Sequence, residues 1–265
     1  AAGDIPAAAF AVFVNFWEVI CLEWFNSWIQ SLIGWFLNLD DRFYNNFIKE
    51  DRWIYLTNGL GTTLLITFFA LIIGIVLGFL IALVRVTGDK TGRLKFLNGI
   101  CRLYLTVIRG TPVMVQLLII YFGIFGSVAV DKVFVAVMAF GLNSAAYVAE
   151  IFRGGIMSID GGQMEAGRSL GLSYNQVMWK IIMPQAVKNV LPALGNEFIV
   201  LIKETSISGY IALQDLTRGG DIIRSRTYDA FMPLIAVALI YLSMVLVLQA
   251  GVKRLERRLA KSDRD

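Results

Sequence analysis

The chain has 265 residues, of which 57% are hydrophobic and 17% are charged, and its mean hydropathy is +0.67. This composition is too apolar for a soluble domain, so the net charge of +4 is not taken as a sign of nucleic-acid binding. The absence of histidine excludes a Ser-His-Asp triad and a histidine general base, and two cysteines cannot supply a four-thiolate metal site.

The first segment, residues 1–52, is apolar but mixed with polar residues. Over residues 5–39, Cys21 and several tryptophans recur at helical spacing and gather indoles on one face: Trp17, Trp24, Trp28 and Trp35. Such a face suits a helix that lies in the membrane interface, which we prefer to a further membrane span. No basic region precedes it, so no cleavable signal peptide is expected.

Five charge-poor intervals are candidates for membrane spans, since a bilayer core of about 30 Å needs about 20 residues in helix. They cover residues 53–84, 110–130, 133–149, 189–202 and 230–252. In the first, Gly74 and Gly78 are spaced so that another helix can approach closely. The expected fold is all-α: a polytopic membrane protein with a transmembrane domain over 53–258 and a short tail over 259–265.

The basic residues orient these spans. Residues 85–109, residues 150–188 and residues 253–265 together hold 16 of the 24 lysines and arginines. Because positive charge accumulates on the cytoplasmic side, these segments are expected inside. The C-terminus is then cytoplasmic and, with five spans, the N-terminus lies outside.

The segment 150–188 is too long and too polar for a simple connection. Residues 163–170 are expected to form a short helix with Glu165 in its first turn, where the helix dipole favours an acid, and Gly171 as its stop. Ser173 is suited to cap a second helix that ends at Pro184. From spacing alone, this pair of helices either stabilises the inner face or docks to another protein.

A helix-start signal, Gly110-Thr111-Pro112, follows a helical pattern of apolar residues over 96–109. Thr111 is suited to an N-cap and Pro112 to a first turn. Two interpretations remain open. Either the preceding helix lies on the inner surface and Arg109 is an interfacial anchor, or that helix enters the membrane and the break presents Arg109 to an anion.

Two ionisable residues fall in or near the fourth span. Counted from Pro184, Glu197 lies about 20 Å along a helix, near the bilayer middle, and Lys203 lies roughly 9 Å beyond it. Glu197 is either a hydrogen-bonding group between helices or a contact for a substrate ammonium. Lys203 is either an interfacial lysine or a gate or carboxylate contact.

The segment 150–188 also resembles a known family. Its residues Glu165-Ala166-Gly167, Gly171, Ile181, Met183 and Pro184 are spaced as in the EAA motif of bacterial ABC importer permeases. Gly167 stands where that family has alanine and Met183 where it has leucine, and both positions are taken as tolerant of size. Residues 108–112 with Gln116-Leu117, AAYVAEIFRGGI and NEFIVLIKETS resemble the polar amino acid branch, of histidine, arginine and glutamine type. The similarity covers about residues 55–258.

The resemblance implies a type I permease fold with five core helices, and a coupling helix that docks to a separate ATPase. The coupling residues it implies are Glu165, Ala166, Gly167, Ser169, Leu170 and Gly171. The chain lacks the G-x-x-x-x-G-K-[ST] motif, so it is not expected to be an enzyme or to hold a cofactor. ATP and Mg are expected on the ATPase subunits.

Further partners implied by the resemblance are an extracytoplasmic solute-binding protein, a second permease chain, identical or sister, and membrane lipid. The substrate is expected to be a polar amino acid, contacted by Arg109, Gly110, Thr111, Glu197 and Lys203, in the bacterial cytoplasmic membrane. The segment 206–229 is then either a solvated loop or a gate or docking surface for the binding protein. Rival functions are a secondary transporter or channel driven by an ion gradient, with Glu197 as relay, and a membrane anchor without a pathway.

Overall fold

The computed structural model describes residues 22–27, 29–30, 34, 38–92 and 94–262. The chain divides into two units, Ala1–Asp51 and Arg52–Asp265. In the first unit the described elements are α2 (Leu39–Phe43), the π-helical turn η1 (Tyr44–Ile48) and the 3-10 turn η2 (Lys49–Asp51). Most of the expected interfacial helix over 5–39 lies outside the described residues, and it stays a prediction.

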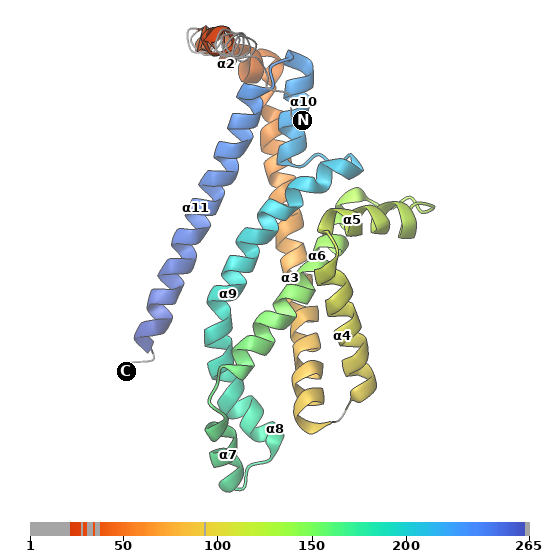
Figure 1. The fold of residues 1–265 in the computed structure, drawn as a ribbon, viewed down its shortest axis with the longest axis vertical. Coiled ribbons are helices and arrows are strands. Elements are labelled where there is room, and N and C mark those ends of the chain that lie inside the picture. Colours follow the sequence, from red (N-terminus) through yellow and green to blue (C-terminus); the bar gives the residue numbers. More distant parts are fainter. Residues whose placement is uncertain (1–21, 28, 31–33, 35–37, 93, 263–265) are drawn as a thin grey trace, which may run out of the picture. The chain divides into compact units, whose positions relative to one another are not determined.

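Every regular element of the second unit is helical among the described residues, as the composition predicts. In chain order they are α3 (Trp53–Thr91), α4 (Lys95–Gly110), α5 (Val113–Leu118), η3 (Ile119–Ile124), α6 (Lys132–Met157), α7 (Gly161–Ser169), α8 (Tyr174–Val177), η4 (Met178–Ile182), α9 (Met183–Glu204), η5 (Thr205–Ile211), α10 (Leu216–Thr227) and α11 (Phe231–Ser262). Figure 1 shows α4 folded back beside α3, and α7 and α8 at the far end of α6 and α9.

Three of the described helices are long and apolar enough to cross a bilayer, namely α3, α6 and α11. The pair formed by α4 and the helical run Val113–Ile124 makes a fourth if both parts count as one span, bent by 109°. The expected span over 189–202 lies in α9, which is 22 residues long. Polar residues such as Lys188 and Glu197 make α9 less apolar than the other three, and it does not join that set.

The expected span over residues 110–130 is wrong in its bounds. The helix ends at Ile124, and residues 125–130 turn: the Phe125 amide donates to the Ile120 carbonyl and the Val128 amide to the Phe125 carbonyl, each at 3.0 Å. An unbroken apolar run does not reveal where the chain turns, because loop residues here are as apolar as the helix.

The packing of α3 on α6 forms the centre of the unit. A Cβ atom added at Gly74 would lie 2.8 Å from the Ser144 Oγ, and one at Gly78 would lie 2.8 Å from the Ala145 carbonyl oxygen. The two glycines therefore bring the helix backbones together, which confirms the predicted packing face. Close contact of this kind lets polar groups on α6 reach across to neighbouring helices.

Candidate functional site

The short helix α7 begins earlier than the sequence predicts. Its N-cap is Asp160, whose carboxylate accepts a hydrogen bond from the Gly162 amide at 3.0 Å. The helix therefore covers Gly161–Ser169 rather than residues 163–170. Glu165 lies in the second turn, so its expected place in the first turn is wrong, and Asp160 supplies the negative charge at the helix start.

The turn after α7 is fixed by local hydrogen bonds, as predicted. Gly171 has a left-handed backbone with φ of +83°, and the Leu172 amide donates to the Gly167 carbonyl at 3.2 Å. Ser173 then caps α8 in a reciprocal capping box with Gln176. The two predicted helices are both present, at a fixed angle set by this turn.

The second helix does not end at Pro184, which is a further correction. It passes through the wider π-helical turn η4 into α9, and Pro184 occupies the first turn of α9. Proline lacks an amide donor but is tolerated in a first turn, and a π-helical turn relaxes the hydrogen-bond pattern before it. The second predicted helix, α8, is therefore continuous through η4 with the long helix α9.

The expected coupling residues divide between two faces of α7. The exposed face comprises Glu165, Ala166, Ser169 and Leu170. Gly167 is buried instead, and a Cβ atom there would lie 2.7 Å from Cγ2 of Val177 on α8. Gly167 thus packs α7 against α8 and is not free to touch a partner. The interpretation of this position as tolerant of size is wrong.

A sharp break separates α4 from α5. Thr111 has an extended backbone, with φ of −123° and ψ of 146°, as a residue before proline requires. Its hydroxyl donates to the Val107 carbonyl at 2.8 Å, so it closes α4. The N-cap position of α5 belongs to Pro112, which makes no side-chain cap bond. The expectation that Thr111 caps the second helix is therefore wrong.

The break lies at the depth of the spanning helices. Leu105 of α4 is buried and packs with Ile81 of α3, and the Tyr104 hydroxyl donates to the Leu142 carbonyl of α6. Both α3 and α6 are long enough to cross a bilayer. The break thus follows a helix that packs against two helices able to span a membrane, and both interpretations of Arg109 stay predictions.

Gln116 holds the two sides of the break together. Its Nε2 amide lies 2.8 Å from the Ile108 carbonyl oxygen, 3.0 Å from the Thr111 carbonyl oxygen and 2.8 Å from the Thr111 hydroxyl, and donates to them. Its Oε1 accepts a 2.9 Å hydrogen bond from Nδ2 of Asn143, which is buried in α6. These bonds satisfy carbonyls that the end of α4 leaves free. In the sequence, only the family motif pointed to Gln116, and nothing pointed to Asn143.

Glu197 is joined to the same part of α6. Ser144 follows Asn143 in the chain, and its Oγ donates to Glu197 Oε1 at 2.8 Å. Ser144 is fully buried and Glu197 is 8% exposed. We call Thr111, Gln116, Asn143, Ser144 and Glu197 the polar belt. Through two consecutive residues of α6 it links the broken helix to α9.

Arg109 lies outside the polar belt. With Gly110, Arg85, Arg102 and Glu150 it lines a cavity of about 510 Å³. Its Nη1 is 4.0 Å from Glu150 Oε2, and its guanidinium lies 5.7 Å from the centre of the Tyr147 ring. The charges around the cavity are partly neutralised, because Asp89 lies 2.7 Å from Arg102 and 4.0 Å from Arg85, and Glu150 pairs more closely with Arg153, at 2.8 Å.

Lys203 lies apart from the polar belt and from the cavity that Arg109 lines. It is exposed and lines a cavity of about 300 Å³ together with Thr217 of α10 and Tyr241 of α11. The five expected substrate residues therefore occupy three places in the chain rather than one pocket. In the described part of the chain, no group of three or more Cys, Asp or Glu side chains is arranged to hold a metal ion.

The segment 206–229 is helical, so its interpretation as a solvated loop is wrong. It contains η5 and α10, and Asp215 caps α10 by accepting hydrogen bonds from the amides of Thr217 at 3.2 Å and Arg218 at 3.1 Å. Asp215 is fully buried, and burial raises the pKa of its carboxyl to about 6.

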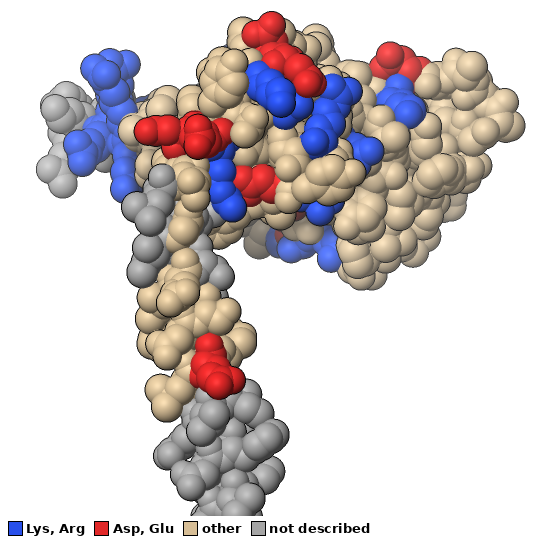
Figure 2. All heavy atoms as spheres, turned by 90° about the horizontal axis from the view of Figure 1, so that it is seen from above, with Lys and Arg blue, Asp and Glu red and all other residues tan. Residues whose placement is uncertain are grey.

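The helix α10 has one packed face and one charged face. Gly59 of α3 and Gly219 of α10 leave no space for a side chain between the two helices. On the exposed face Asp221 pairs with Arg218 at 2.6 Å and with Arg224 at 2.5 Å. Figure 2, which looks onto this end of α3 and α10, shows acidic and basic side chains mixed together. Both arginines of this face are therefore paired with the same carboxylate of α10.

Comparison with protein families finds one match that covers most of the second unit. The model described as "Binding-protein-dependent transport system inner membrane component" matches residues 74–261. The arginine transport system permease protein ArtQ of Bacillus subtilis (strain 168) is 40% identical over 211 residues, which are 79% of this chain and 94% of that protein. The glutamine transport system permease protein GlnP of Escherichia coli (strain K12) is 39% identical over 207 residues, which are 77% of this chain and 92% of that protein.

Solved structures agree with these relatives. A crystal structure of an amino acid ABC transporter with histidines contains a chain that is 43% identical, with a TM-score of 0.73, covering 80% of this chain and 98% of that one. The inward-facing MetNI methionine ABC transporter has a similar fold, with a TM-score of 0.68 at 20% identity over 78% of this chain and 97% of that one.

Proposed function

This chain belongs to the family of inner membrane components of binding-protein-dependent transport systems, and we infer from that membership that it is the permease subunit of an ABC importer for amino acids. It is a multi-pass protein of the inner membrane and part of a complex with ATPase subunits. ATP hydrolysis belongs to those separate subunits, and permease subunits carry no cofactor. The observation that carries this conclusion is the family match over residues 74–261.

We propose that the exposed face of α7 docks to the ATPase. Glu165, Ala166, Ser169 and Leu170 form this face, while Gly167 and Gly171 shape the helix and its turn. A short helix with small side chains fits a groove closely, and a charged residue on it can set the orientation. Closure of two ATPases on nucleotide then moves α7 and opens the membrane domain to the other side.

The substrate is a polar amino acid that passes three places in turn. Lys203 contacts it in the cavity next to α10, and Thr111 and Glu197 contact it in the polar belt. Arg109 and Gly110 contact it in the cavity that they line together with Glu150. The carboxylate suits Arg109 and Lys203, and the ammonium suits Glu197. The names of the arginine and glutamine permeases support a polar substrate.

The mixed-charge face of α10 receives the extracytoplasmic binding protein. A second permease chain, identical or sister, completes the pathway, and membrane lipid covers the outward apolar faces. The C-terminus is cytoplasmic and the N-terminus outside, as the 16 basic residues of the segments assigned to the inner side require.

The substrate class is tested by thermal unfolding of the detergent-solubilised complex, and of its binding protein, with each standard amino acid in turn. A ligand that binds the folded protein raises the unfolding temperature, and the rise grows with the logarithm of the ligand concentration divided by Kd. We expect one or a few polar amino acids to stabilise the complex and the binding protein. Stabilisation by none of them, or only by apolar amino acids, contradicts the proposed substrate.

A further inference from the structure

Two pairs of side chains join the segment around α7 to α9. Gln163 Nε2 donates to Gln185 Oε1 at 3.1 Å, and Gln185 Nε2 donates back to Gln163 Oε1 at 2.6 Å. One turn further along α9, Asn189 Nδ2 donates to Ser158 Oγ at 3.0 Å. Residues four apart on a helix share a face. α9 therefore holds the chain on both sides of Asp160, the N-cap of α7.

The first pair is itself held in place. Gln185 Nε2 also donates to the Ile181 carbonyl at 2.8 Å, which fixes the direction of its amide. Beside the second pair, Gly155 of α6 has no room for a side chain against Val190 of α9. The end of α6, the helix α7 and the first half of α9 are thus packed and bonded as one body.

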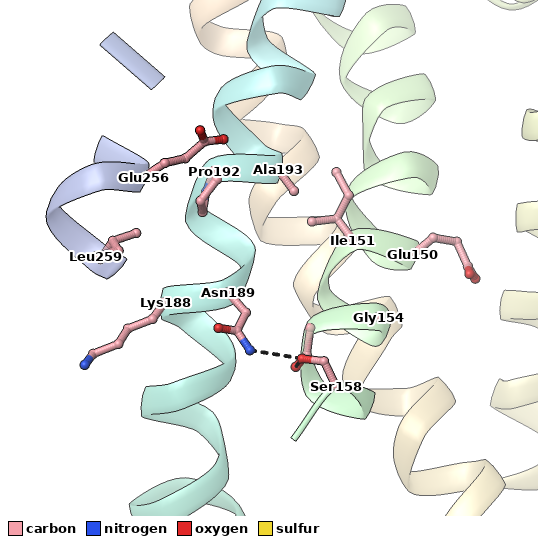
Figure 3. A pocket seen from close by; sticks show the side chains of 11 residues that line it. Glu150, Ile151, Gly154, Ser158, Lys188, Asn189, Pro192, Ala193, Glu256 and Leu259 are labelled. Carbon is pink, nitrogen blue, oxygen red and sulfur yellow. Dashed lines mark hydrogen bonds between the residues drawn. The ribbon is translucent and has the colours of Figure 1, made fainter. Parts of the chain in front are cut away.

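On its other side, α9 faces α11. Gly195 packs closely against Val252 of α11, where an added Cβ atom would lie 2.6 Å from Cγ2. Nearer to α7, a cavity of about 630 Å³ is lined by α6, α9 and α11 together, and its lining includes Ser158, Asn189 and Glu256. Figure 3 shows Asn189 turned toward Ser158 on one side of α9, with Glu256 and Leu259 of α11 on the other. Among the described residues, the side-chain hydrogen bonds at this end of α9 join it to the segment around α7.

We propose that Gln163, Gln185, Ser158 and Asn189 are positioning residues that clamp α7 to α9, so that a displacement of α7 moves α9 as one lever. At 1.5 Å per residue, Glu197 lies about 18 Å along this lever from Gln185. The clamp thus connects the docking helix to the polar belt. This inference rests on the proposed docking of α7 to the ATPase.

The test uses the complete complex in lipid vesicles, with amino acid uptake and ATP hydrolysis measured on the same sample. Gln163→Leu and Gln185→Leu keep the side-chain size but remove the reciprocal hydrogen bonds. We expect the amount of amino acid taken up per ATP to fall about tenfold, as the loss of two amide hydrogen bonds allows, while ATP hydrolysis stays at the wild-type rate.

Two further variants separate the clamp from a general loss of structure. Gln163→Glu still accepts the hydrogen bond from Gln185 Nε2 but no longer donates to Gln185 Oε1, so it should lose less uptake per ATP than Gln163→Leu. Asn175→Leu is a matched control, because Asn175 is exposed on α8 and makes no side-chain hydrogen bond to the described residues. Asn175→Leu should leave the uptake per ATP unchanged. Ser158→Ala with Asn189→Ala provides an independent disruption with the same expected loss.

The clamp is overturned if Gln163→Leu, Gln185→Leu and the double variant Ser158→Ala with Asn189→Ala all keep the wild-type uptake per ATP. It is also overturned if Gln163→Glu and Asn175→Leu lose as much uptake per ATP as the disrupting variants. Release of the ATPase by the clamp variants also counts against it. Failure of the docking proposal is recognised separately by Glu165→Arg with Leu170→Asp on the exposed face. If those changes leave the ATPase bound and uptake normal, α7 is not the docking helix.

Discussion

Ser144 of α6 donates a 2.8 Å hydrogen bond to Glu197 of α9, and both residues are buried. The preceding residue, Asn143, is bonded to Gln116 at the break between α4 and α5. A buried carboxyl group needs a hydrogen-bond partner, and here α6 supplies it. The serine therefore fixes Glu197 in the same layer as the broken helix, where we place the middle of the transport pathway.

Replacing Glu197 with glutamine separates its charge from its hydrogen bond. The amide oxygen of the new side chain can still accept from Ser144, so the unfolding temperature of the complex should change little. If the carboxylate holds a substrate ammonium, the KM for uptake should rise about tenfold or more, as for loss of a charged hydrogen bond. The measurement is uptake against substrate concentration. An unchanged KM together with an unchanged rate would favour a purely structural role for Glu197.

Gln116→Leu removes the amide that bridges the break in the broken helix. The carbonyl oxygens of Ile108 and Thr111 lose their donor, and Asn143 loses its acceptor. Because buried polar groups left without partners cost about 1–3 kcal/mol each, we expect the complex to lose at least about 2 kcal/mol of stability. Thermal unfolding measures the loss. Val115→Leu, at an exposed neighbouring position, is the control, and equal stability of the two variants would contradict this role of Gln116.

The break illustrates what the sequence could and could not predict. Gly110-Thr111-Pro112 signals a discontinuity because proline disfavours helix in the residue before it. The signal does not reveal the depth of the break, which depends on the packing of Leu105 against Ile81. Nor does it reveal Asn143, whose role arises from a contact between residues 27 positions apart in the chain. Such contacts exist only once α5 and α6 are packed together.

Gly167→Ala tests the packing of α7 on α8. The added Cβ would press on Val177, so we expect a loss of about 1–3 kcal/mol from overpacking and weaker coupling of ATP hydrolysis to uptake. Val177→Ala in the same chain should restore much of both by making room. Uptake per ATP and thermal unfolding are the measurements. If the single variant behaves as the wild type, the spacing between the two helices is looser than described.

The predicted helices were most accurate where charge-poor runs are long. The expected spans over 53–84, 133–149 and 230–252 correspond to α3, α6 and α11, all of which continue past the predicted C-terminal bound. Polar helices were predicted less well. Pro184 does not stop the helix, because a π-helical turn precedes it, and such a turn has no simple sequence signal.

Asp215 offers a test at the start of α10. Asp215→Ala removes the cap and should cost about 1 kcal/mol, whereas Asp215→Asn keeps an acceptor and should cost less. The pKa of Asp215 is raised to about 6 from 3.8, so the folded protein binds this proton more tightly than the unfolded chain. The resulting stabilisation is full below pH 3.8 and is lost as pH rises through about 6.

The pH dependence of Asp215 is read from unfolding temperatures at pH 7 and pH 5. Relative to Asp215→Asn, the wild type should become more stable on acidification, because only the wild type gains a proton at this position. Parallel shifts of the two proteins would show that Asp215 does not titrate in this range.

Uptake into vesicles decides whether this chain is the membrane subunit of an ATP-driven importer. The vesicles contain this permease with its ATPase and binding protein, ATP is supplied at the ATPase side, and a labelled polar amino acid at the other. We expect uptake that requires ATP hydrolysis, the ATPase and the binding protein, and that persists when ion gradients are collapsed. Uptake by this chain alone, driven by an ion gradient and indifferent to ATP, would show the assignment to be wrong.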